Sequence, residues 1–138
     1  MREDELPTQV AAAVIYAKDM LRISRFYEAI AGFSFVEEAP GHVVLEARGF
    51  QLTVVAVPAH IAVAIDIADP PVRREATPVK LVYFVSSIPL ARDRVAALGG
   101  RMNSKAREWQ FHGTRVCDGS DPEGNMFQLR ENARVTPP

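Results

Sequence analysis

Apolar positions recur at helical spacing in two segments of the chain. The first segment follows Asp19, a favourable N-cap residue, and ends at Gly32, a favourable C-cap residue. The second follows Ser87 and ends at Gly99-Gly100. The two apolar stripes coincide when the first is moved by 68 positions, which predicts two equivalent helices in a duplicated chain. The stripes are Met20, Ile23, Tyr27 and Ile30, and Ile88, Ala91, Val95 and Leu98.

Short runs rich in β-branched and aromatic residues flank both segments and predict strands. Turn residues such as Pro40-Gly41 and Arg48-Gly49 separate these runs. Each half therefore has the order β-α-β-β-β, which predicts an α+β fold of two tandem modules. The expected strands are Gln9–Ala17, Phe33–Glu38, His42–Ala47 and Phe50–Val57 in the first half, and Val79–Val85, Arg101–Arg107, Phe111–Cys117 and Asn125–Glu131 in the second.

The two modules are expected to form one domain over residues 1–138. Module one covers about 8–57, module two covers about 79–131, and residues 58–78 form a linker between them. The linker holds four of the ten prolines and the charged run Arg73-Arg74-Glu75. The stretch Ala62–Ile67 could add a short strand within it.

Composition limits the classes of function. The 138 residues are 48% apolar, which supplies enough material for a core. Sixteen basic and seventeen acidic residues give a net charge of −1, so nucleic acid and anionic membrane surfaces are not expected partners. The longest apolar run, Val10–Ala17, is too short to cross a bilayer. A single cysteine, Cys117, fits a reducing compartment, and we expect a cytoplasmic protein.

The duplicated pattern resembles the vicinal oxygen chelate superfamily, which includes glyoxalase I, extradiol dioxygenases, and fosfomycin and bleomycin resistance proteins. Residues 18–33 are similar to the first helix of that family, with its Phe26-Tyr27 pair and Gly32-Phe33 ending. The stretch Asp121-Pro-Glu-Gly-Asn125 is similar to the turn before its last strand, and 97–100 to the end of its second helix. The resemblance covers about residues 8–131. It implies curved mixed sheets that form a cup, with the helices outside.

Metal-dependent members of the superfamily place ligands on the first and last strand of each module. The resemblance carries these positions onto Ala12, Thr53, Lys80 and Gln128. Alanine has no donor atom, and threonine and glutamine are weak ligands without carboxylate or imidazole companions. At an effective dielectric constant near 20, a lysine charge about 4 Å from a unit cation costs roughly 4 kcal/mol. We therefore expect no metal at these positions and no cofactor.

A metal held by other ligands stays open. His42, Glu46 and His112 lack ligand spacing along the sequence, but distant strands can bring such residues together.

Strand alternation predicts which side chains line the cup. The opposite set, which includes Ala13, Ile15, Leu81, Tyr83, Val85, Phe127 and Leu129, is expected to pack against the helices. Trp109 could add an aromatic wall, although a single tryptophan often closes a core. The result is a mostly apolar cavity with a few polar groups, which is typical of a small-molecule site. The expected ligand-binding residues are Ala12, Val14, Tyr16, Thr53, Lys80, Val82, Phe84, Trp109, Met126, Gln128 and Arg130, with Gln51 and Val55 on the same face.

Lys80 and Arg130 are the two positively charged residues among the expected lining residues. Either cation could hold an anionic or enolate-like group, and Lys80 could act as a catalytic base. The alternative is that each side chain reaches the rim or pairs with a carboxylate such as Glu46.

Three functions follow from these residues. The first is a small-molecule-binding protein of the glyoxalase/bleomycin resistance type, whose apolar cup lacks the family metal and takes an apolar ligand with an anionic group. The second is a lyase/isomerase or dioxygenase-type enzyme, metal-dependent through other ligands or metal-free with Lys80 as base. The third is a dimerisation module with a collapsed cup. Because symmetric dimers are the commonest oligomers, and the resemblance points the same way, we expect a homodimer.

Overall fold

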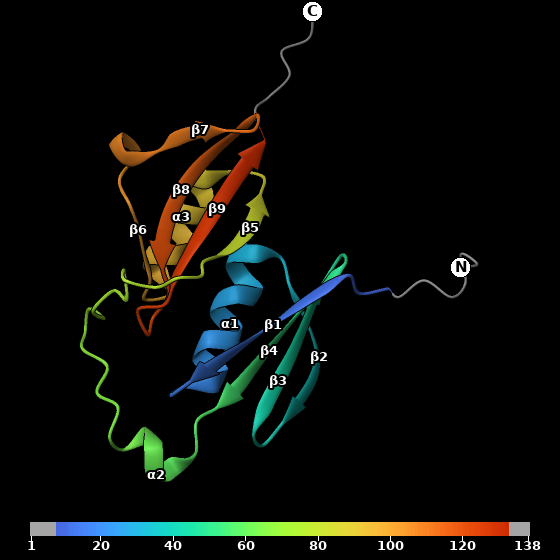
Figure 1. The fold of residues 1–138 in the computed structure, drawn as a ribbon, viewed down its shortest axis with the longest axis vertical. Helices are drawn as coiled ribbons and strands as arrows, with labels where there is room; N and C mark the ends of the chain where they lie inside the picture. The colour runs from blue at the N-terminus through green and yellow to red at the C-terminus, as the bar shows by residue number, and fades with distance from the viewer. Residues whose placement is uncertain (1–7, 133–138) are drawn as a thin grey trace, which may run out of the picture. The chain divides into compact units, whose positions relative to one another are not determined.

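The computed structural model describes residues 8–132, which form two compact units (Figure 1). Unit 1 contains Gly32–Ile65 together with the preceding residues up to Glu28. Unit 2 contains Ala29–Ala31 and the chain from Asp66 onward. Each unit is described by itself.

The sheet of unit 1 has four strands. They are β1 (Ala11–Ala17), β2 (Ser34–Ala39), β3 (His42–Ala47) and β4 (Phe50–Ala56), and α1 (Met20–Ala31) follows β1 in the chain. The strand order is β1-β4-β3-β2. The first strand runs parallel to the last, and the other neighbours are antiparallel.

Unit 2 repeats this topology. Its elements are β5 (Leu81–Val85), α3 (Ile88–Ala97), β6 (Arg101–Met102), the 3-10 helix η2 (Lys105–Arg107), β7 (Trp109–Phe111), β8 (Thr114–Ser120) and β9 (Met126–Asn132). The strand order is β5-β9-β8-β6, and β7 also pairs with β8. The first strand is again parallel to the last. Val14 lies opposite Thr53 in unit 1, and Val82 lies opposite Gln128 in unit 2, at the same point of each repeat. The predicted α+β fold of two tandem β-α-β-β-β modules is confirmed.

Both predicted helix starts are confirmed by capping hydrogen bonds. The Asp19 carboxylate accepts from the backbone N–H of Arg22 at 3.1 Å. The Ser87 hydroxyl accepts from the backbone N–H of Leu90 at 3.2 Å. These bonds satisfy N–H groups that have no partner within a helix. At its other end α1 stops at Gly32, whose φ of 71° places it in the left-handed region that glycine favours.

Three predicted segments are wrong. The strand expected over 111–117 is interrupted, because His112 and Gly113 both have positive φ and form a tight two-residue turn between β7 and β8. The strand expected over 101–107 ends at Met102 and gives way to η2. No strand forms over 62–67. Instead the linker carries a short helix, α2 (Ala59–Ala62).

One face of the unit 2 sheet is covered by α3, which contacts β6 and β9. The helix buries Ile88, Ala91 and Val95, and Phe127 and Leu129 on β9 are fully buried. We call the opposite face of this sheet, on which Gln128 and Arg130 lie, the open face. In unit 1, Val43, Leu45, Leu52 and Val54 are fully buried on one face of the sheet. The alternate positions Val14 and Tyr16 are 56% and 67% exposed. The alternation of buried and exposed positions is therefore present in the unit 1 sheet.

The helices within residues 8–132 are short in relation to a bilayer. None of them combines the length and the apolar composition that a membrane-spanning helix requires.

Candidate functional site

Four side chains on the open face of unit 2 form a continuous chain of polar contacts. The Lys80 ammonium donates to Asp118 Oδ2 at 2.8 Å. Gln128 Nε2 donates to Asp118 Oδ1 at 3.0 Å, and Arg130 Nε donates to Gln128 Oε1 at 2.9 Å. Strand register explains the arrangement, because Asp118 lies opposite Gln128 and Arg130 follows two residues later on the same face. We call this set the Lys80–Arg130 chain.

The Lys80–Arg130 chain does not suit a metal ion. Lys80 and Gln128 stand at two of the four positions onto which the family resemblance carries metal ligands, but the lysine ammonium is a donor without lone pairs. The Gln128 oxygen already accepts from a guanidinium. The one carboxylate in the chain, Asp118, is shared between an ammonium and an amide. The donor set of unit 2 therefore does not fit the family metal.

The other candidate ligands have different partners. His42 Nε2 lies 2.9 Å from Glu37 Oε2, and Glu46 accepts from Gln51 Nε2 at 3.1 Å. Both pairs belong to unit 1, whereas His112 lies in the β7–β8 turn of unit 2. Within residues 8–132, no three His, Cys, Asp or Glu side chains gather so that they could hold a metal ion.

Aromatic side chains surround Arg130 on the open face. The Arg130 guanidinium carbon lies 4.9 Å from the centroid of the Phe111 ring, a cation–π distance. Phe84 on β5 is the register neighbour of Arg130 and is 61% exposed. On the other side of Arg130, Val116 on β8 lies opposite Arg130 and also opposite Trp109 on β7. Trp109 is 39% exposed. A guanidinium flanked by accessible rings can hold a group that is both apolar and anionic.

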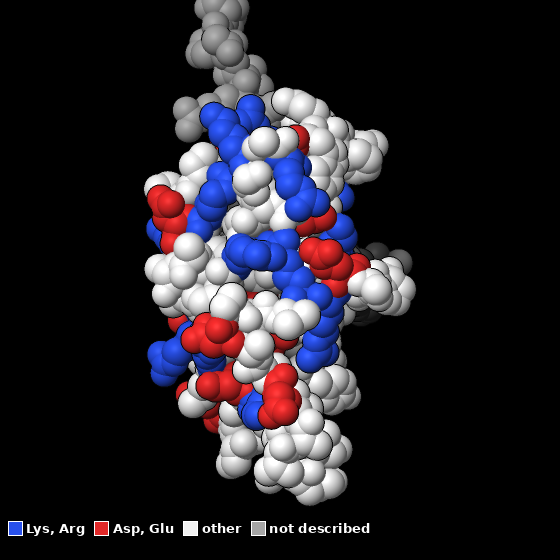
Figure 2. All heavy atoms as spheres, turned by 90° about the vertical axis from the view of Figure 1, so that its left-hand side faces the viewer, with Lys and Arg blue, Asp and Glu red and all other residues white. Residues whose placement is uncertain are grey.

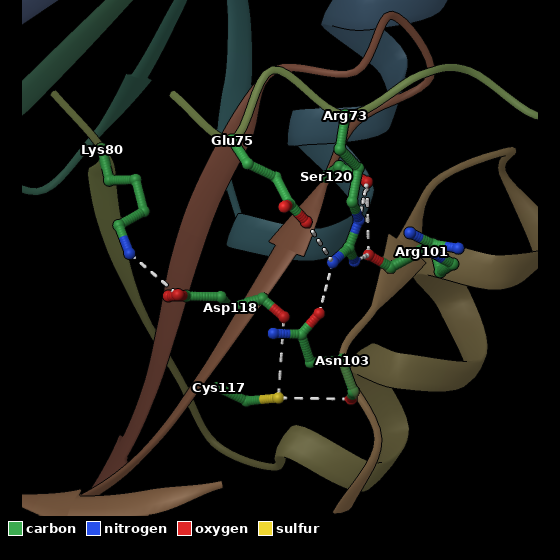
Figure 3. A network of polar contacts seen from close by, with 8 residues as sticks. All are labelled: Arg73, Glu75, Lys80, Arg101, Asn103, Cys117, Asp118 and Ser120. Carbon is green, nitrogen blue, oxygen red and sulfur yellow. Dashed lines mark hydrogen bonds and ion pairs between the residues drawn. The ribbon is translucent and has the colours of Figure 1, made fainter. Parts of the chain in front are cut away.

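The linker contributes a second polar cluster, which Figure 3 shows beside Lys80 and Asp118. Residues 72–75, which we call the strap, lie against the end of β8 and the turn after it. Arg73 Nε donates to Ser120 Oγ at 2.9 Å, and its two other nitrogens donate to the Asn103 side chain and the Arg101 carbonyl. The backbone N–H of Arg74 donates to Gly124 O at 2.9 Å. The strap is thus fastened to unit 2 rather than being a free connection.

Cys117 lies on the covered side of the same strand. It is fully buried, and its thiol donates to the Asn103 carbonyl at 3.3 Å (Figure 3). Burial raises the pKa of the thiol, and this effect outweighs the opposing influence of Arg92. The side chain therefore serves as a small buried core residue and stays protonated near neutral pH.

Positive side chains gather on unit 2, as the charged atoms in Figure 2 show. Between Arg101 and Arg115 the sequence holds four basic residues and one acidic residue, Glu108. The Glu108 carboxylate is 8% exposed and pairs with Arg92 and Arg115. A shallow depression of about 250 Å³ lies at this edge of the sheet, lined by Lys105, Glu108, Trp109, Gln110 and Arg115. The basic side chains that line this depression make the local electrostatic potential more positive, which attracts anions.

The predicted lining residues divide between the two units. The structure places Lys80, Gln128 and Arg130 in one connected set, with Val82, Phe84, Trp109 and Met126 at alternate positions of the same sheet. Ala12, Val14, Tyr16 and Thr53 lie at alternate positions of the unit 1 sheet. The carboxylate that pairs with Lys80 is Asp118 and not Glu46.

Sequence reasoning missed Asp118 and Phe111. Asp118 falls after the end of the strand that the sequence predicts, because the β7–β8 turn was not recognised. The pairing of β8 with β9 places Asp118 opposite Gln128 and therefore on the open face.

Comparisons with known proteins agree with this fold. The model of the glyoxalase-like domain family matches residues 12–130. A glyoxalase-related enzyme from Fulvimarina pelagi is 21% identical, with a TM-score of 0.64 over 91% of this chain and 89% of that one. The bleomycin resistance determinant encoded on transposon Tn5 is 18% identical, with a TM-score of 0.55 over 88% and 95%.

A third similar structure is that of a mutant of the fosfomycin resistance protein FosX from Listeria monocytogenes, in complex with Mn(II) and 1S,2S-dihydroxypropylphosphonic acid. It is 14% identical, with a TM-score of 0.61 over 94% of this chain and 91% of that one. No curated protein matches the sequence. The structural likenesses show the fold alone, whereas the family model spans most of the chain. The chain therefore belongs to the glyoxalase-like domain family, within the vicinal oxygen chelate fold.

Proposed function

We propose that this protein binds an apolar small molecule with an anionic group and does so without the metal ion of its metal-dependent relatives. The proposal rests on the side-chain partners of Lys80 and Gln128, the two residues of unit 2 that stand at the metal-ligand positions of the family. Lys80 is paired with Asp118, and the Gln128 oxygen is held by Arg130. A divalent ion at this place would have to displace two cationic groups and compete for one shared carboxylate.

The open face also suits such a ligand in its composition. Exposed aromatic side chains offer apolar surface, and Arg130 offers a permanent positive charge. The unit 1 residues Ala12, Val14, Tyr16 and Thr53 remain predicted contacts. The presence of exposed apolar groups on that sheet, including Val14 and Tyr16, supports their inclusion.

The enzymatic alternative with Lys80 as base is less well supported. A general base needs a free lone pair aimed at the proton that it removes. In this structure the Lys80 nitrogen donates to Asp118 at 2.8 Å and is engaged as a hydrogen-bond donor. A metal-dependent lyase, isomerase or dioxygenase would need ligands other than the open-face residues of unit 2.

A thermal-shift screen of the untagged protein tests the proposal. The protein is dialysed against EDTA and then screened with matched pairs of apolar compounds, one anionic and one neutral in each pair. We expect stabilisation by anionic members, with the same shift in the presence and absence of added Zn²⁺, Ni²⁺, Mn²⁺ or Fe²⁺. Stabilisation that appears only after a metal is added would contradict the proposal.

We also propose a homodimer in the cytoplasm. Exposed apolar side chains on unit 1 outside the predicted lining, such as Val36, Ile61 and Val63, provide surface that a second copy could bury. Sedimentation equilibrium at micromolar concentration should give twice the chain mass of 15.2 kDa, and a monomer would contradict this proposal.

A further inference from the structure

Arg130 is the positive group of the open face that remains uncompensated. Among residues 8–132 no carboxylate forms an ion pair with it, and its one side-chain hydrogen bond there runs from Nε to Gln128. Lys80, by contrast, is neutralised by Asp118. The Lys80–Arg130 chain therefore carries one net positive charge, and that charge lies at the Arg130 end.

The orientation of the Arg130 guanidinium is fixed from two sides. Gln128 accepts from Nε, and the Phe111 ring lies 4.9 Å from the guanidinium carbon. Gln128 is itself held by Asp118 and is only 8% exposed. These contacts leave the two terminal nitrogens, with four N–H groups, without a hydrogen-bond partner among the described residues. A guanidinium held in this way has already lost part of its rotamer entropy, so binding costs less.

The planar fork of a guanidinium matches a carboxylate, which it can hold through two parallel hydrogen bonds. A carboxylate carries one negative charge, equal to the one uncompensated positive charge of the chain. A phosphate monoester carries nearly two charges at neutral pH and would be only partly neutralised. Charge balance therefore favours a carboxylate over a phosphate at this site.

The aromatic side chains on the same face as Arg130 define the rest of the ligand. Phe84 is the direct register neighbour of Arg130, Trp109 lies two strands away on the other side, beyond Val116, and both are accessible. Accessible rings favour a flat aromatic body through offset stacking or edge contacts. We propose that the open face of unit 2 binds an aryl carboxylate, with Arg130 as the anchor of the carboxylate, and Phe84 and Trp109 against the ring. This inference rests on the proposed function and names its ligand class.

Calorimetric titration with three matched probes tests the ligand class. The probes are 2-naphthoate, the neutral 2-naphthamide and the saturated decahydro-2-naphthoate. We expect 2-naphthoate to bind at least tenfold more tightly than either of the other two. Decahydro-2-naphthoate binding as tight as that of 2-naphthoate would overturn the inference but leave the proposed function standing, whereas amide binding as tight as that of the acid would contradict both. The inference would also be overturned if none of the three bound at 1 mM, or if 2-naphthyl phosphate bound more tightly than 2-naphthoate.

Two arginine variants test the anchor. Arg130→Met should remove the preference for 2-naphthoate over 2-naphthamide. Arg94→Met deletes the same charge from an exposed position on α3 and should keep that preference. If Arg130→Met does not fold, Arg130→Lys retains the charge but loses the fork, and it should lower the preference at least threefold. An unchanged preference in the folded Arg130 variant would overturn the assignment.

The chain's single tryptophan reports where the probe binds. Its indole N–H gives one resolvable signal in a ¹⁵N-labelled sample. Saturating 2-naphthoate should shift this signal in the wild type and in Arg94→Met. An unmoved signal at saturation would place the ligand elsewhere and overturn the site.

Discussion

A single methyl group added at Gly124 should destabilise unit 2 strongly. It lies in the turn between β8 and β9 with a φ of +86°, in the left-handed region. A Cβ built on Gly124 would lie 2.1 Å from the carbonyl oxygen of Val72 and 3.1 Å from its carbonyl carbon. These are backbone atoms, which cannot rotate away as a side chain can. Gly124→Ala therefore has to push the strap off the turn.

The cost has two parts. The left-handed conformation costs an alanine about 1–2 kcal/mol relative to glycine. Displacing the strap also breaks the bond from Arg74 N–H to Gly124 O and withdraws the Arg73 guanidinium from Ser120. A neutral hydrogen bond is worth about 1 kcal/mol and one to a charged group about 1.5–3 kcal/mol. We expect a total loss of roughly 4 kcal/mol in the free energy of unfolding, a large share of the usual 5–15 kcal/mol.

Gly113→Ala is the matched control. Gly113 also belongs to unit 2 and has a φ of +70°, but a Cβ there would meet no atom within 4 Å. It should lose only the conformational part, about 1–2 kcal/mol. Urea unfolding followed by circular dichroism and by Trp109 fluorescence measures both variants. A Gly124→Ala loss within about 0.5 kcal/mol of the Gly113→Ala loss would refute the account of the strap.

Four further outcomes are expected. Arg73→Met should lower the free energy of unfolding by about 2 kcal/mol, because it leaves the Ser120 and Asn103 oxygens without their charged donor; a change below about 0.5 kcal/mol in urea unfolding would contradict this. Lys80→Met should cost only about 0.5–1 kcal/mol by the same method, because the pair with Asp118 is partly exposed, and a loss above about 3 kcal/mol would count against it. Cys117 should react with iodoacetamide at the rate of unfolding in native buffer, and rapid labelling would show that the thiol is accessible. Burial raises the pKa of the Cys117 thiol in the folded state, so the stability that it contributes is fully present below the pKa of the unfolded thiol, about 8.5, and is lost as pH rises above that value. Cys117→Ala should therefore make the free energy of unfolding fall less steeply at alkaline pH. An equally steep fall in the variant would contradict the assignment.

Local signals were sufficient to predict most of the fold. Asp19 and Ser87 marked both helix starts, because side-chain capping is a local interaction. β3 was predicted with its observed bounds, since Gly41 and Gly49 bracket an alternating run. The 68-residue offset between the helices also anticipated the equivalence of Val14 and Val82, which occupy the same register position in the two sheets.

The missed features depend on unusual backbone geometry or on contacts between distant residues. The β7–β8 turn places His112 at a φ of 47°, a conformation that histidine alone does not signal, although the following Gly113 offered a hint. The strap holds Arg73 against Ser120 across 47 positions, and nothing in the local sequence announces that contact. Lys80 meets Asp118 across 38 positions. The alternation of side chains along a strand was enough to predict that Gln128 and Arg130 lie on the same face of their sheet.

Elemental analysis is the most direct test of the claim that the Lys80–Arg130 chain takes the place of the family metal. The untagged protein is purified without a chelator, incubated with Ni²⁺, Zn²⁺, Mn²⁺ or Fe²⁺, and desalted before the measurement. The account predicts less than about 0.1 equivalent of any divalent metal per chain, because the ammonium and guanidinium groups occupy the donors of unit 2. One tightly retained equivalent would contradict it.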